Sequence, residues 1–187
     1  MISIACTYLV TLSLFPGVES EMTNCQWREW LPIVLMALFN MFDVCGKIIA
    51  LAAHQLLSPA QLVVGSVLRI VYIPLMIMCI LPKHSPRLAN TFWQFLLSST
   101  LGLTNGYFGS VPMIRAPLII IEERKELTGN LMMFSYSIGL TMGSLLSYLL
   151  DGIIGRSTGV DWCQARSSLN QTLWTMMNSS TSNDSQS

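Results

Sequence analysis

The amino-acid sequence predicts an all-α polytopic membrane protein, and its composition, its charge placement and the length of its apolar stretches all indicate this class. Of the 187 residues, 52% are hydrophobic and only 11% are charged, whereas soluble domains carry about 25% charged residues. So few charged side chains cannot cover the surface of a soluble domain of this size. The formal net charge is zero, so the composition predicts no nucleic-acid partner.

Five apolar stretches are long enough to cross a bilayer, because a helix needs about 20 residues to span a hydrocarbon core of about 30 Å. They cover residues 2–18, 31–53, 62–81, 92–114 and 130–150. The short polar segments between them hold most of the charged residues. The backbone must satisfy its own hydrogen bonds in lipid, and these stretches are far longer than barrel strands. We therefore expect five transmembrane helices within a membrane domain at 1–154.

The first stretch has two interpretations, a membrane span or a signal peptide. No basic residue precedes it, and its end at 16–20 is a poor small-residue cleavage site. We therefore interpret it as a span. Because the chain begins almost inside this apolar run, we also expect either a further segment upstream or a short isoform.

The segment 155–187 is rich in Ser, Thr and Asn and predicts a flexible extracellular tail. Asn170, Asn178 and Asn183 each begin an Asn-x-Ser/Thr sequon, and glycosylation requires the outer or lumenal side of a membrane. The Lys and Arg residues do not orient the chain, because both sets of joints carry them. Counting five spans puts Cys25 and Cys163 on this outer side, where they can form a disulfide.

Two stretches carry small residues at every fourth position, which keeps them on one helix face. The stripes are Ser98, Gly102, Gly106 and Ser110, and then Ser135, Gly139, Gly143 and Ser147. Small residues let membrane helices approach closely. We interpret both stripes as helix-packing surfaces; a substrate pathway along them is the alternative.

Charged residues inside apolar stretches are functional candidates, because each costs a few kcal/mol to insert. Asp43 and Lys47 lie four residues apart and can pair on one face of a helix. The pair is either a self-neutralising element needed for folding or a polar site that lines a cavity. Asn40, one turn earlier, adds an amide to the same predicted site. There, Asp43 can accept hydrogen bonds from substrate hydroxyls or face a positive charge.

Arg69 and Asn105 extend the list of candidate substrate-binding residues. Arg69 has no acidic residue near it in sequence, so it is either a structural anchor or a substrate contact. Asn105 can form a hydrogen bond between helices. Arg115 lies between Pro112 and Pro117, where we expect the fourth span to break near the inner surface. No catalytic dyad, metal-ligand pair or P-loop is present in the sequence, so we predict neither an enzyme nor a cofactor.

Five strings resemble the equilibrative nucleoside transporter family, in the family's order. They are 11–17 (TLSLFPG), 39–47 (FNMFDVCGK), 68–75 (LRIVYIPL), 104–112 (TNGYFGSVP) and 126–130 (ELTGN). The resemblance covers about 7–150 and implies facilitated diffusion of nucleosides. It also implies that Asn40, Asp43 and Lys47 line the central cavity, with Asp43 and Lys47 on the ribose hydroxyls.

Lys47, where the family commonly has Arg, and the string 105–113 resemble most the plasma membrane monoamine transporter branch, which moves organic cations and adenosine. The family has eleven spans in a major-facilitator-like fold, and this chain resembles the last five. The resemblance therefore implies a cytoplasmic start, an outward tail and a partner in the form of a six-span half or another copy. A truncated, non-transporting fragment or isoform that associates with a full-length transporter is the alternative function.

Overall fold

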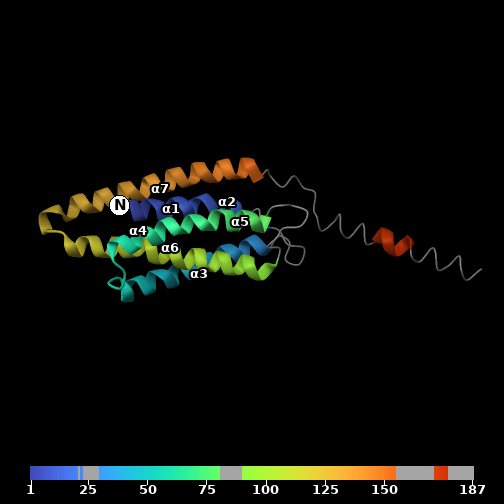
Figure 1. The fold of residues 1–187 in the computed structure, drawn as a ribbon, viewed down its shortest axis with the longest axis horizontal. Helices are drawn as coiled ribbons and strands as arrows, with labels where there is room; N and C mark the ends of the chain where they lie inside the picture. Colours follow the sequence, from blue (N-terminus) through green and yellow to red (C-terminus); the bar gives the residue numbers. More distant parts are fainter. Residues whose placement is uncertain (21, 23–29, 81–89, 155–170, 177–187) are drawn as a thin grey trace, which may run out of the picture.

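The computed structural model describes residues 1–20, 22, 30–80, 90–154 and 171–176. Long helices lie side by side along the long axis of the molecule; α7 runs along one edge of the view and α3 along the other (Figure 1). The elements are α1 (Ile2–Leu14), α2 (Gly17–Ser20), α3 (Trp30–Ala53), α4 (Pro59–Leu68), η1 (Arg69–Val71), α5 (Tyr72–Ile80), α6 (Thr91–Ile119), η2 (Glu122–Arg124) and α7 (Lys125–Ile154). The described residues contain no strand.

Four helical stretches are long and apolar enough to cross a membrane, within the part of the chain that the structure describes. They are Ile2–Ser20, Trp30–Ala53, Pro59–Ile80 and Lys125–Gly152. Large apolar side chains on these helices are exposed, including Val44, Leu51, Val64 and Leu149. Lipid solvates such side chains in a membrane protein. The prediction of an all-α polytopic membrane protein is confirmed.

Helix α6 is not among these four stretches, although its 29 residues exceed the length needed to cross a bilayer. Its buried face carries polar side chains, among them Gln94, Ser98 and Asn105. These residues lower the average hydropathy of the helix while remaining shielded by its neighbours. Five spans, with α6 as the fourth, stays a prediction.

The predicted break near Arg115 is wrong. Helix α6 continues through Pro112 and Pro117 to Ile119. A proline removes one backbone donor, and membrane helices tolerate this where neighbouring groups satisfy the freed carbonyl. Arg115 is half-buried, and its guanidinium donates a hydrogen bond to the carbonyl of Leu57, in the segment between α3 and α4.

The Ser98–Ser110 stripe lies against α3. The Ser98 hydroxyl donates to the Leu35 carbonyl at 3.0 Å. A Cβ atom built on Gly102 would overlap the Phe39 carbonyl, and one on Gly106 would overlap the Asp43 carbonyl. The two backbones therefore meet directly along this stripe.

The Ser135–Ser147 stripe lies against α1 and α2. A Cβ on Gly139 would come within 2.7 Å of the Ala5 carbonyl oxygen, and one on Gly143 within 2.8 Å of the Leu9 carbonyl oxygen. Ser147 packs on Gly17 at the start of α2. The bundle is thus built from two closely packed helix pairs, α3 with α6 and α1 with α7.

Candidate functional site

An ion pair on α3 is the centre of the candidate site. Lys47 Nζ lies 2.6 Å from Asp43 Oδ2, with the lysine side chain 52% exposed and the aspartate side chain 11% exposed. The spacing of four residues brings both groups to one helix face. The pair therefore has a buried acceptor and an accessible donor.

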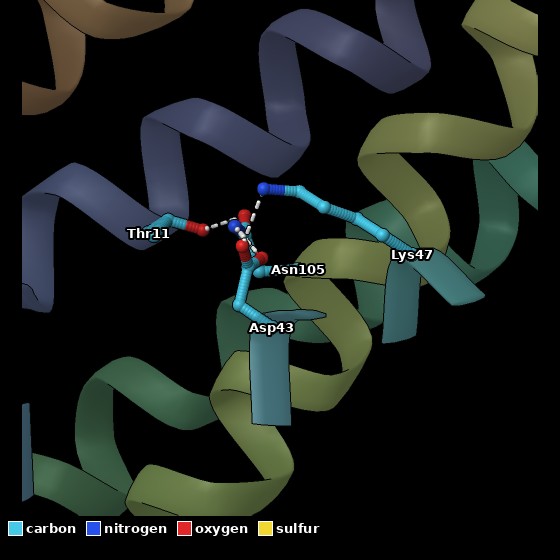
Figure 2. Close-up of polar contacts among 4 residues, drawn as sticks. All are labelled: Thr11, Asp43, Lys47 and Asn105. Carbon is cyan, nitrogen blue, oxygen red and sulfur yellow. Dashed lines mark hydrogen bonds and ion pairs between the residues drawn. The ribbon is translucent and has the colours of Figure 1, made fainter. Parts of the chain in front are cut away.

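Asn105 holds the other oxygen of Asp43. Its side-chain NH₂ donates to Asp43 Oδ1 at 2.7 Å, and its carbonyl oxygen accepts a hydrogen bond from the Thr11 hydroxyl, also at 2.7 Å. Figure 2 shows these side chains meeting between α1, α3 and α6. Both Asn105 and Thr11 are buried. Asp43 is thus held from the interior by Asn105 and from the accessible side by Lys47.

Arg69 lies behind this cluster, at the junction of α4 and η1. It is 2% exposed. Its guanidinium donates to the Thr11 hydroxyl at 3.0 Å, the Leu101 carbonyl at 3.2 Å and the Thr7 carbonyl at 3.3 Å. It makes no ion pair within the described part of the chain. A buried cation that uses carbonyl and hydroxyl acceptors ties η1 to α1 and α6.

The cluster therefore contains one carboxylate and two cations, of which only Lys47 is accessible. Such a site can donate charged hydrogen bonds through Lys47 and accept them at Asp43, which suits a ligand with hydroxyl groups. Among the residues that the structure describes, no group of three or more His, Cys, Asp or Glu is arranged to hold a metal ion.

Asn40 lies outside this cluster. It is exposed, and its amide donates to the Met36 carbonyl of its own helix at 2.8 Å. The structure thus brings together four of the five candidate substrate-binding residues, and places Asn40 one turn away on a more accessible face of α3.

Thr11 is the member of the cluster that sequence reasoning missed as a site residue. A signal for it exists, because Ser3, Thr7 and Thr11 recur every fourth residue in an otherwise apolar run. Ser3 and Thr7 use this face to bond Ser66 of α4, with oxygen–oxygen distances of 2.6 and 3.3 Å. The candidate disulfide (Cys25, Cys163) and the sequons (Asn170, Asn178, Asn183) lie outside the described residues.

Comparison with known proteins places this bundle in a family. The family model described as "Nucleoside transporter" matches residues 1–151. The chain belongs to the nucleoside transporter family. It is 48% identical over 148 residues to equilibrative nucleoside transporter 4 of Homo sapiens and 47% identical over 148 residues to that of Danio rerio, covering 79% of this chain in each case. It is 36% identical over 148 residues to equilibrative nucleotide transporter 1 of Arabidopsis thaliana, covering 78% of this chain.

The aligned region is a small part of each of these three relatives. It spans 28% of the human and zebrafish proteins and 32% of the Arabidopsis protein. All of the polar cluster lies within the part of this chain that the family model matches. The family membership and the helical architecture together establish an integral membrane protein.

Proposed function

We propose that this chain is the five-span part of a facilitated-diffusion transporter, and that Asp43 and Lys47 contact its substrate. The observation that carries the proposal is the ion pair inside an apolar helix, with Lys47 half-exposed and Asp43 held by a buried hydrogen bond, because an accessible ammonium can give up its partner to a ligand. Relatives named as nucleoside and nucleotide transporters support the same class of function.

Nucleosides are the first substrate class we propose. Lys47 can donate to a ribose oxygen while Asp43 accepts from a ribose hydroxyl. Hydrogen bonds to charged groups contribute roughly 1.5–3 kcal/mol each, and several together reach micromolar to millimolar affinity. Asn40 offers a further amide one turn along α3, and Asn105 and Arg69 complete the site from the interior. Organic cations such as monoamines are the second class, with Asp43 facing the ammonium group.

A second body of helices, either a six-span half or another copy of this chain, would cover the accessible side of the Asp43–Lys47 pair. We place the assembled protein in the plasma membrane with the tail at 155–187 outside. Glycosylation at Asn170, Asn178 or Asn183 and a disulfide between Cys25 and Cys163 are consistent with that orientation.

Uptake of labelled adenosine and of a labelled monoamine by cells that express this chain tests the proposal. Surface delivery is checked by glycosidase treatment. We expect saturable uptake that is lost in Asp43→Asn and retained in Asp151→Asn, the matched change of an aspartate on α7 outside the cluster. The preferred substrate then decides between nucleosides and organic cations.

The alternative is a non-transporting membrane piece that associates with a full-length relative. It predicts surface delivery without uptake, and co-purification with that relative. Equal uptake by Asp43→Asn and the unaltered chain would contradict the role given to the ion pair.

A further inference from the structure

Thr11 is buried in α1 and does not reach the accessible side of the ion pair, yet it connects Arg69 to Asn105. We propose that Thr11 is a positioning residue. Thr11, with Arg69 behind it, holds the Asn105 amide in place. The amide in turn keeps the Asp43 carboxylate fixed when the substrate replaces the Lys47 ammonium as its partner. This inference rests on the proposed function of Asp43 and Lys47.

The direction of each hydrogen bond follows from the chemistry of the groups. A guanidinium only donates, so the Thr11 oxygen must accept from Arg69 Nη2, 3.0 Å away. An ionised carboxylate only accepts, so Asn105 turns its NH₂ toward Asp43 and its carbonyl oxygen toward Thr11. The single hydroxyl proton of Thr11 then lies between the Asn105 oxygen at 2.7 Å and the Thr7 carbonyl at 2.8 Å.

All the donors in this series point the same way, from the Arg69 cation to the Asp43 anion. Hydrogen bonds in such a chain polarise one another in a low-dielectric interior. Reversing the Asn105 amide would place its oxygen against the carboxylate and its NH₂ against the Thr11 hydroxyl. The Asp43 carboxylate therefore fixes which way the Asn105 amide turns, and the Thr11 hydroxyl, which accepts from Arg69, holds the amide oxygen that faces α1.

Packing fixes the backbone of both partners of the ion pair, because a Cβ atom on Gly106 would meet the Asp43 carbonyl and the Lys47 backbone nitrogen. The backbone at Asp43 is pressed against Gly106, and the backbone at Gly46 is pressed against the Leu103 carbonyl of α6. The Lys47 side chain is half-exposed. Figure 2 shows its ammonium group meeting the Asp43 carboxylate. A ligand can replace the lysine ammonium without moving α3, provided that Asn105 keeps its hold on Oδ1.

Adenosine binding to the purified full chain in lipid nanodiscs tests the inference through a double-mutant cycle. Thr11→Val removes the hydroxyl with little change of shape, and Asn105→Ala cuts the connection to Asp43. We expect Thr11→Val to weaken adenosine affinity about fivefold to tenfold, the scale of one hydrogen bond. The double variant should bind no more weakly than Asn105→Ala alone, because both changes break the same connection. Thr11→Ser should restore affinity to within about twofold of the unaltered chain.

Ser66→Ala is the matched control, because it removes a buried hydroxyl from the interface of α1 and α4 that does not connect to Asp43. It should leave the affinity of the folded protein within about twofold. Thermal unfolding of each variant separates folding from binding. The inference is overturned if folded Thr11→Val binds adenosine with unaltered affinity. It is also overturned if the double variant loses affinity by the product of the two single losses. Absence of saturable binding by the unaltered chain would instead reject the proposed function, and this inference with it.

Discussion

The α3–α6 and α1–α7 helix pairs share one sequence pattern, a stripe of small residues, but the two stripes support different features. Both bring helix backbones together along small residues four apart, with Gly106 on the Asp43 carbonyl in one pair and Gly139 on the Ala5 carbonyl in the other. In the part of these two contacts that the structure describes, the ionisable Asp43–Lys47 pair and the hydrogen bonds that hold it lie at the α3–α6 contact. The stripe on α7 therefore serves packing, whereas the stripe on α6 also positions a candidate binding site.

The contrast shows how close packing supports polar chemistry in a membrane. At Gly106 no side chain separates α6 from α3, so Asn105, one residue earlier, reaches across to Asp43. A larger residue at this position would move α6 away and break the hydrogen bond from Asn105 to Asp43, which leaves the Asn105 NH₂ in the membrane without this partner. Burying unpaired polar groups costs several kcal/mol.

The largest expected effect is the loss of stability when a stripe glycine is replaced by alanine, and it should differ between the α3–α6 and α1–α7 pairs. Gly106→Ala should lower the free energy of unfolding by about 3 kcal/mol, near the top of the range for overpacking, because the added methyl group meets backbone rather than a flexible side chain. Gly139→Ala should cost about 1–2 kcal/mol, since its Cβ would lie 2.7 Å from the Ala5 oxygen and has less overlap to relieve. Thermal or denaturant unfolding in detergent measures both.

Gly129→Ala is the matched control, because a Cβ on this α7 glycine meets nothing within 4 Å. It should leave stability unchanged or raise it by up to about 1 kcal/mol, because alanine is the better helix former. Adenosine binding should be lost in Gly106→Ala and retained by the folded fraction of Gly139→Ala. Equal binding by the two variants would show that the α6 stripe, like the α7 stripe, is a packing surface alone.

A smaller effect is expected at Lys47, on the accessible side of the α3–α6 pair. Lys47→Arg should tighten adenosine binding by about threefold to tenfold, because a guanidinium can offer two parallel N–H donors where an ammonium acts as a point charge. Equilibrium binding measures the change, and Lys125→Arg at the start of α7 should leave affinity within about twofold. Weaker binding by Lys47→Arg would indicate that the site selects the compact ammonium.

Local spacing explains which features could be predicted from the sequence. The apolar stretches, the two small-residue stripes and the pairing of Asp43 with Lys47 all follow from residues that repeat along one helix. Helix periodicity likewise predicted Asn40 beside Asp43. In the structure the Asn40 amide donates to the Met36 carbonyl of the same helix and stays exposed.

The remaining parts of the site depend on contacts between helices distant in sequence. Nothing near Arg69 in sequence indicates that its partners are Thr7, Thr11 and Leu101, since these come from α1 and α6. The role of Thr11 was missed for the same reason. The predicted break at Pro112 and Pro117 failed because proline preferences measured in water overstate its effect within a packed membrane helix.

Equilibrium binding of labelled adenosine to the purified chain in lipid nanodiscs tests the central claim most directly, because it separates recognition from transport. The unaltered chain and Asp151→Asn should bind saturably with equal affinity, and Asp43→Asn should lose that binding while unfolding at a similar temperature. Equal adenosine binding by Asp43→Asn and the unaltered chain, or no saturable binding by either, would contradict the assignment of the Asp43–Lys47 pair as the substrate site.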